Sequence, residues 1–167
     1  MARGYAAAVA SAAVVLLLGC ASEDADTEPD YTGLGNFDTA VVAIVRGGDT
    51  LRITAEIAET EDQRQLGLME RRSLPEQHGM IFVYDSVQDA ASSFWMFRTR
   101  IPLDIAFADS LGVIGAIQQM QPCESPNPQL CRTYPAQTRY KYALEMNHGF
   151  FERHDVNIGD TIRVVSR

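Results

Sequence analysis

The amino-acid sequence predicts a mainly β protein, a β-sandwich or an open barrel with one packed α-helix. At least seven short segments carry strand signals, whereas only one segment has the signals of both helix ends. The chain has 167 residues, 46% of them hydrophobic and 22% charged, which are ordinary globular values. This composition excludes a disordered chain and a protein with many membrane spans, and the length favours one folded domain.

The N-terminus has the pattern of a lipoprotein signal peptide over residues 1–19. Residues 6–18 contain only Ala, Val, Leu and Ser, a run too short to cross a bilayer but suited to the apolar region of an export signal. The run leads into Leu17-Leu18-Gly19-Cys20, which resembles the lipobox of bacterial lipoproteins. We therefore expect Cys20 to carry a lipid anchor. An ordinary signal peptide with an incidental cysteine is the open alternative.

Residues 20–38 are predicted to form a flexible acidic linker between this anchor and the domain. Five acidic residues occur between Glu23 and Asp30, and like charges extend a chain. The residue after Cys20 is Ala21 rather than aspartate, which by resemblance to lipoprotein sorting rules predicts the outer membrane facing the periplasm. In a cell with one membrane, the expectation is its outer face.

The charge balance argues against nucleic acid as a partner. The chain has 14 Lys and Arg against 22 Asp and Glu, a net charge of −8. A protein that binds a phosphate backbone needs the opposite sign. The expected partner is therefore the membrane, reached through the lipid rather than through basic residues.

The predicted domain, residues 39–167, opens with a hairpin followed by the helix. Residues 41–45 and 51–57 read as strands joined by a glycine turn at 46–49. Thr60 and Gln63 form a capping-box pattern, and Arg71 with its neighbour Arg72 suits the negative end of a helix dipole. This spacing predicts one helix from Thr60 to Arg72, and Gly67 inside it indicates a close approach to neighbouring backbone.

Strand signals dominate the rest of the domain. Residues 94–97, Phe-Trp-Met-Phe, are apolar on both faces, which predicts a central strand. Residues 149–153 suit a second, short helix. The further predicted strands are residues 80–84, 93–97, 103–108, 113–120, 140–146 and 161–165.

Two cysteines remain once Cys20 is assigned to the lipid. Cys123 and Cys131 form an even pair in an exported chain, and their spacing matches no common zinc site. We expect a disulfide that contributes about 2–3 kcal/mol to stability.

Several segments of the domain form an unusual combination. The longest block is Phe94-Trp95-Met96-x-x-Thr99-x-Ile101-Pro102-Leu103-Asp104-Ile105, and the others are Gly67-Leu68-Met69-x-Arg71-x-x-Leu74, Gly79-Met80-Ile81-Phe82, Ala143-Leu144-Glu145-x-Asn147-x-Gly149 and Gly159-Asp160. Together they resemble the domain-of-unknown-function-192 family of exported or membrane-tethered domains. The resemblance implies a jelly-roll-like sandwich with a packed helix and no established activity. The cysteine loop departs from the commonest members.

Two carboxylates lie in apolar runs of the sequence. Asp104 is expected either to pair with Arg71, Arg98 or Arg100 as a structural anchor, or to contact a ligand at a strand end. Glu145 is the second such carboxylate, and the two together would suit the acid and base of glycan hydrolysis.

The single tryptophan is a candidate stacking platform. Trp95, with Tyr84, Phe82 and Tyr142, would suit a sugar ring or an apolar ligand, and core packing is the alternative. The candidate ligand-binding residues are Arg71, Trp95, Thr99, Asp104 and Glu145.

Two methionine and histidine pairs suggest a copper site. The pairs are His78 with Met80 and Met146 with His148, and thioether and imidazole both bind copper in exported proteins. The alternative is that the methionines fill gaps in the core.

The sequence as a whole favours an envelope lipoprotein whose domain binds a small ligand, a glycan or an envelope protein without catalysis or a cofactor. It shows no phosphate-binding glycine loop and no pattern of a nucleophilic triad. A carboxylate-dependent hydrolase of envelope polysaccharide and a copper-binding accessory protein are the alternatives.

Overall fold

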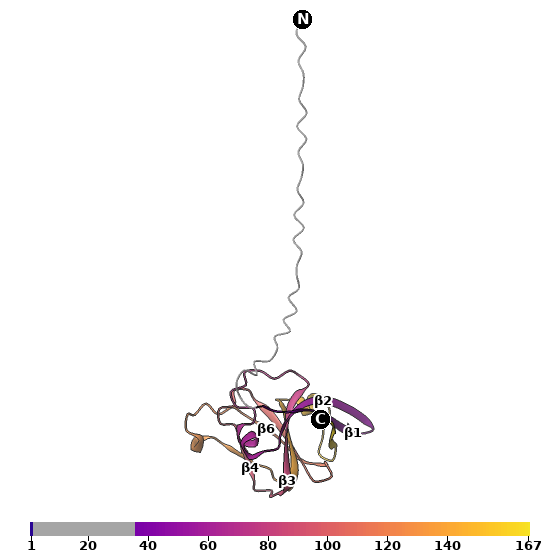
Figure 1. Cartoon of the computed structure of the whole chain (residues 1–167), viewed down its shortest axis with the longest axis vertical. Coiled ribbons are helices and arrows are strands. Elements are labelled where there is room, and N and C mark those ends of the chain that lie inside the picture. Colours follow the sequence, from indigo (N-terminus) through magenta and orange to yellow (C-terminus); the bar gives the residue numbers. More distant parts are fainter. Residues whose placement is uncertain (2–35) are drawn as a thin grey trace.

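A mixed sheet of seven strands forms the body of the domain in the computed structural model (Figure 1). The structure describes Met1 and residues 36–167. The predicted signal peptide of residues 1–19, the lipid site Cys20 and all of the linker before residue 36 lie outside this described part. Within it, no helix is both long enough and apolar enough to cross a membrane.

The elements follow one another as nine strands, two α-helices and one 3-10 helix over residues 36–167. They are β1 (Thr39–Arg46), β2 (Asp49–Ala58), α1 (Glu61–Leu66), β3 (His78–Gln88), β4 (Ser93–Trp95), β5 (Leu103–Ala108), β6 (Ile114–Met120), η1 (Pro128–Leu130), β7 (Thr133–Pro135), β8 (Tyr140–Asn147), α2 (Phe150–Arg153) and β9 (Thr161–Ser166). The predicted opening hairpin, the second short helix and the later strands are confirmed, except that the strand predicted over residues 93–97 ends at Trp95.

The seven strands run in the order β6-β5-β8-β3-β2-β1-β9. Strands β1 and β2 pair antiparallel across a turn in which Gly47 and Gly48 both have positive φ, the conformation that favours glycine. Strands β2 and β3 are parallel, so the chain must cross over between them, and it does so through α1. The sequence pattern did not predict this parallel pair.

Helix α1 is shorter than the sequence predicted. The capping box is present, since the Gln63 amide donates to Thr60 Oγ1 at 3.2 Å and Gln63 Oε1 accepts from the Thr60 amide at 3.0 Å. The helix ends at Leu66 because Gly67 has φ of +50° and leaves the helical path. The predicted extension to Arg72 is therefore wrong. A Cβ at Gly67 would lie 3.5 Å from the Phe82 ring and 3.8 Å from the carbonyl oxygen of Arg64.

The segment 94–97 is not a central strand. Only Ser93–Trp95 is extended, and it pairs with β7 in a separate sheet of two strands. Met96 is 1% exposed whereas Trp95 is 42% exposed, so one side of the segment faces the core and the other faces solvent. The apolar residues on the side opposite Met96 are the exposed Trp95 and the half-buried Phe97, so the segment is not buried on both faces.

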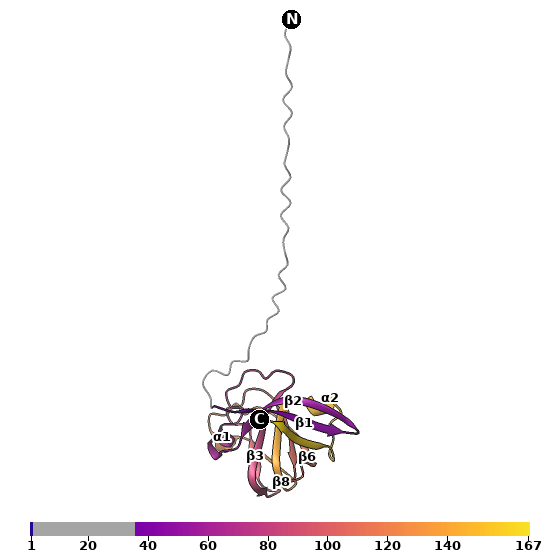
Figure 2. The same ribbon diagram turned by 45° about the vertical axis from the view of Figure 1, so that its right-hand side comes forward.

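Both faces of the large sheet are covered, and each has its own core. Helix α2 packs with β1 and β9 against one face, where Leu144 is fully buried. The loop after α1 and the β4–β7 pair cover the other face, where Ala143 is fully buried. Figure 2 shows α1 and α2 on opposite sides of the central strands. We call these the α2 face and the α1 face.

The sheet curls without closing into a barrel. Its two edge strands, β6 and β9, approach one another through an isolated bridge between Val113 and Thr161. The Ile162 amide donates to the carbonyl of Gly112 at 2.8 Å beside this bridge. The predicted class, a mainly β sandwich-like domain with a packed helix, is confirmed.

Candidate ligand-binding site

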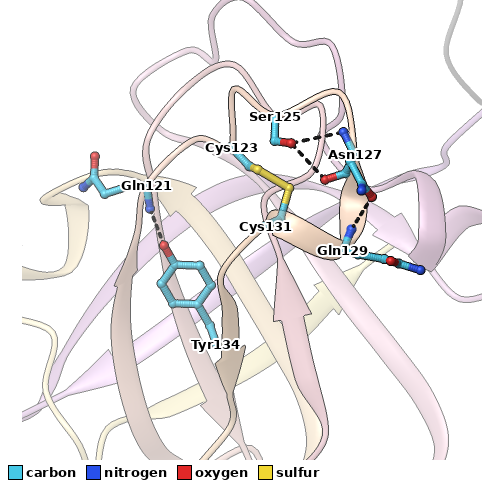
Figure 3. Close-up of a disulfide and its surroundings, with 7 residues drawn as sticks. All are labelled: Gln121, Cys123, Ser125, Asn127, Gln129, Cys131 and Tyr134. Atoms are coloured by element: carbon cyan, nitrogen blue, oxygen red, sulfur yellow. Dashed lines mark hydrogen bonds between the residues drawn. A yellow bond between two sulfur atoms is a disulfide. The ribbon is translucent and has the colours of Figure 1, made fainter.

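The predicted disulfide is present and shapes one rim of the domain. Cys123 and Cys131 are joined, with their Cα atoms 5.6 Å apart. Within the loop that they close, Ser125 Oγ accepts from the Asn127 amide at 3.1 Å, and Asn127 Oδ1 accepts from the Gln129 amide at 3.0 Å (Figure 3). The loop is thus held by its own polar side chains as well as by the covalent bond.

A hollow of about 670 Å³ opens beside this disulfide. This volume is in the range of small-molecule sites. We call it the rim hollow, and its lining residues are Glu70, Phe97, Arg98, Thr99, Arg100, Pro122, Cys123, Glu124, Ser125 and Pro126.

Glu70 joins two arginines at the rim hollow. Arg98 Nε donates to Glu70 Oε1 at 2.7 Å, and Arg100 Nε donates to Glu70 Oε2 at 2.6 Å. The hydrogen bonds from Arg98 and Arg100 lower the pKa of the Glu70 carboxyl. Both arginine side chains remain more than half exposed, so each keeps N–H donors that face solvent.

The backbone of the same site is unusual. Glu70 and Arg98 have φ of +60° and +57°, values that are uncommon for residues other than glycine. The two are linked directly, because the Glu70 amide donates to the Arg98 carbonyl at 2.7 Å. Such conformations cluster at binding and active sites, where the surrounding structure holds them in place.

Thr99 ties the rim hollow to the α1 face of the sheet. Its side chain is buried, and the carbonyl of Met96 accepts hydrogen bonds from the amides of Thr99 and Cys123. The loop that carries the two arginines is therefore anchored on a fully buried residue and on the disulfide. Because its side chain is buried, the role of Thr99 is to position the loop of the rim hollow.

Trp95 lies on a second, smaller hollow of about 350 Å³. The Arg64 guanidinium stacks 4.8 Å above the Tyr84 ring, and Tyr84 and Trp95 both line this hollow. Phe82 is 2% exposed inside the α1-face core, and Tyr142 packs on the opposite face, so neither belongs to this platform. We call it the α1 hollow, and its lining residues are Glu61, Arg64, Gln65, Tyr84, Ser93, Phe94 and Trp95.

Arg71 lies in a third hollow, of about 600 Å³, where the described chain begins. It is buried, and its Nη2 donates to Glu56 Oε2 at 2.6 Å. His78 lines the same hollow. Arg71 is therefore separate from Trp95, which lines the α1 hollow.

Asp104 is anchored by a histidine. Its Oδ1 lies 3.0 Å from His148 Nδ1, and its side chain is 3% exposed whereas that of His148 is 38% exposed. The arginines proposed as its partners pair with Glu56 and Glu70 instead. The expectation of an Asp104 ion pair with Arg98 or Arg100 is therefore wrong, because those side chains turn toward the rim hollow.

The two carboxylates of the hydrolase hypothesis do not face a common cleft. In the β5–β8 pairing, Asp104 lies opposite Met146 and Ile105 lies opposite Glu145. Cross-strand partners share a face and successive residues alternate. Asp104 thus lies on the α2 face and Glu145 on the α1 face, an arrangement that no acid and base acting on one sugar ring can have.

Glu145 is buried in the α1-face core, with 4% of its surface exposed. Desolvation by burial raises the pKa of its carboxyl to about 8. Within the described part of the chain, no hydrogen bond or salt bridge reaches this carboxyl group. A neutral, protonated Glu145 is the form that this environment favours at neutral pH.

The copper hypothesis also fails on geometry. Gly79 lies opposite Met146 in the β3–β8 pairing, so Met80 on β3 points to the other face from Met146. Both methionines are fully buried, and His148 is bonded to Asp104. The two Met–His pairs do not converge, and residues 36–167 contain no group of three or more His, Cys, Asp or Glu side chains placed to hold a metal ion.

The structure therefore separates the five candidate residues. Thr99 lies at the rim hollow, Trp95 at the α1 hollow and Arg71 at the third hollow, while Asp104 and Glu145 lie on opposite faces of the sheet. The sequence had predicted no binding role for four residues that line the rim hollow: Glu70, Phe97, Arg98 and Arg100. The triplet Arg98-Thr99-Arg100 was the one local signal of this site in the sequence. Its acidic partner, Glu70, is far away along the chain.

Fold and site define a single mainly β domain with a curled mixed sheet, two covered faces and a hollow beside a disulfide. The profile of DUF192, described as "Uncharacterized ACR", matches residues 42–164. The chain belongs to this family, as the motif segments predicted. No curated protein matches the chain.

Two solved structures share this fold. A protein from Sinorhizobium meliloti 1021, described as a candidate transcription regulator, is 30% identical, with a TM-score of 0.70 over 79% of this chain and 98% of that one. A protein of unknown function from Novosphingobium aromaticivorans DSM 12444 is 25% identical, with a TM-score of 0.68 over 81% of this chain and 91% of that one. The similarity thus spans nearly the whole described domain.

Proposed function

We propose that this protein is a lipid-anchored envelope protein whose domain binds a small polar ligand in the rim hollow without chemical conversion. The observation that carries the proposal is the construction of that hollow. Glu70 and Arg98 hold uncommon backbone conformations there, and two exposed guanidinium groups are fixed on one carboxylate. Groups that are fixed before binding lose little entropy when a ligand arrives.

Export and anchoring rest on the sequence of the N-terminus. A lipid on Cys20 and an acidic linker would hold the domain close to a membrane surface. A single acyl chain anchors weakly, whereas the several chains of a lipidated cysteine anchor stably. Replacing the cysteine, Cys20→Ala, is expected to move the protein from the membrane pellet to the soluble fraction after cell lysis. A variant that stays in the pellet would contradict lipid anchoring.

The charge of the chain argues against a nucleic acid as its ligand. Sequence-independent binding to nucleic acid requires clustered cations, and this chain has a net charge of −8. At the rim hollow, the two arginines are matched by Glu70 and Glu124. A ligand that is small and rich in hydrogen-bonding groups suits this lining better than a polyanion does.

The test of the rim hollow is a thermal-shift comparison of variants. The double variant Arg98→Gln, Arg100→Gln removes both guanidinium groups, and Arg52→Gln removes an exposed arginine of β2 as a matched control. The probes are N-acetylglucosamine, glucuronate, glutarate and inorganic phosphate. A probe at a hundred times its Kd stabilises the folded state by about 2.7 kcal/mol, which raises Tm by several degrees.

The expected result is that at least one probe stabilises the unaltered protein and Arg52→Gln equally, and fails to stabilise the double variant. Equal stabilisation of all three proteins would show that binding occurs elsewhere. The absence of a Tm shift with every probe would contradict a small polar ligand and leave an envelope protein as the partner.

A further inference from the structure

An exposed tryptophan and a half-buried phenylalanine form a ridge between the rim hollow and the α1 hollow. Trp95 lines the α1 hollow and Phe97 lines the rim hollow. Their ring centroids are 5.6 Å apart and their planes are tilted by 40°. Residues 95 and 97 lie on the same side of their segment, since Met96 between them points into the core. The two rings in contact therefore connect the hollows, because each ring lines one of them.

The polar groups on the two sides of this ridge balance in charge. In the rim hollow, Arg98 and Arg100 are matched by Glu70 and Glu124. In the α1 hollow, Arg64 Nη2 lies 3.2 Å from Glu61 Oε2. Each hollow thus offers both N–H donors and carboxylate acceptors.

This balance discriminates between classes of ligand. An anion needs donors and is repelled by carboxylates, whereas each hydroxyl of a sugar both donates and accepts hydrogen bonds. The C–H groups on the flat side of a sugar ring pack against an aromatic face. An exposed tryptophan beside a half-buried phenylalanine, flanked by fixed donors and acceptors, therefore suits a neutral sugar better than a phosphate or a carboxylate.

The side chains that would contact the sugar are already held in place. The Arg64 guanidinium stacks on Tyr84 and donates to the backbone carbonyls of Glu59 and Val83. At the other end, Arg98 and Arg100 are fixed on Glu70. A surface that is rigid at both ends of an aromatic wall can bind a chain of linked rings at low entropic cost.

We infer that the two hollows and the Trp95–Phe97 ridge form one continuous binding surface for a neutral oligosaccharide. One ring of the sugar chain stacks on the ridge, and the rings on either side enter the rim hollow and the α1 hollow. This inference rests on the proposed function, because it specifies the ligand class of the same site. It adds a subsite that the rim hollow alone does not contain.

The chain offers a direct test because Trp95 is its only tryptophan, so its fluorescence reports on the ridge alone. N-acetylglucosamine, its β-1,4-linked tetramer and a tetramer of galacturonate would be titrated into the purified protein. We expect the neutral tetramer to change the fluorescence and to bind at least tenfold more tightly than the monomer, with little binding of the acidic tetramer.

Variants separate the ridge from the rest of the site by calorimetric titration. Trp95→Ala is expected to weaken tetramer binding at least tenfold and monomer binding less than twofold. Trp95→Phe keeps an aromatic ring and is expected to retain most of the tetramer affinity. Leu111→Ala removes an exposed apolar side chain on a different loop and should leave both affinities unchanged.

The outcomes distinguish this inference from the proposed function. If the monomer binds in the rim hollow, with no gain from chain length and no effect of Trp95→Ala, the ridge is not a subsite although the proposed function stands. If the acidic tetramer binds more tightly than the neutral one, the ligand class is wrong. If no sugar binds while another small probe does, the inference fails alone, and if no probe binds, both fail.

Discussion

Burial of Glu145 without a polar partner among residues 36–167 predicts an unusual dependence of stability on pH. The substitution Glu145→Gln keeps the shape of the side chain and removes the ionisable proton. We expect this variant to be as stable as the unaltered protein at pH 4.5 and increasingly more stable as the pH rises. The physical reason is that the unfolded chain ionises this carboxyl readily, whereas the α1-face core does not.

The magnitude follows from the two pKa values. The pKa of Glu145 rises from the ordinary 4.5 to about 8 in the folded protein. Between pH 4.5 and pH 8, the unfolded state loses the proton that the folded state keeps. The free energy of unfolding therefore falls by about 1.4 kcal/mol per pH unit, in total by about 5 kcal/mol. Above pH 8 both states are ionised and no further loss occurs.

Urea unfolding at several pH values between 4.5 and 9 measures this effect. The relevant quantity is the difference in free energy of unfolding between Glu145→Gln and the unaltered protein, because contributions common to the two proteins cancel in it. At pH 7 the difference should be about 3 kcal/mol in favour of the variant. A difference that stays constant across the whole pH range would refute the buried, unpaired carboxyl.

Three other predictions concern stability. Opening the disulfide by Cys123→Ser should lower the free energy of unfolding by about 2.5 kcal/mol, measured by urea unfolding, and an unchanged midpoint would show that the bridge does not restrain the unfolded chain. Gly112→Ala should destabilise the protein by about 1–3 kcal/mol more than Gly159→Ala, because both glycines have positive φ but only the first would place a Cβ against the carbonyl oxygen of Ile162; equal losses in thermal unfolding would contradict the contact between the sheet edges. His148→Ala should cost about 1–3 kcal/mol by leaving the Asp104 carboxylate without its partner, and unaltered stability would show that solvent satisfies that carboxylate.

The sequence was informative where local physics decides the structure. Alternating apolar residues correctly indicate β2, and the capping box correctly places the start of α1. The end of α1 was missed because Gly67 reads equally well as a helical residue under strain and as a terminator. Its positive φ decides between the two, and the local sequence pattern does not reveal that angle.

The candidate site was only partly predictable because its pairings are long-range. The disulfide could be inferred by counting cysteines, and Trp95 could be singled out as a candidate binding residue because it is the only tryptophan in the sequence. The partner of Arg98 and Arg100 is a glutamate 28 and 30 positions away, and nothing local in the sequence links the three. Asp104 was correctly expected to need a partner, but a histidine that follows β8 supplies it.

The measurement that tests the central claim most directly is the change in Trp95 fluorescence on titration with the neutral tetramer of N-acetylglucosamine. A saturable change in the unaltered protein that is lost in Arg98→Gln, Arg100→Gln and kept in Arg52→Gln is the predicted result. A fluorescence that stays flat to millimolar sugar, or a change that is the same in all three proteins, would contradict a glycan-binding surface at the disulfide rim.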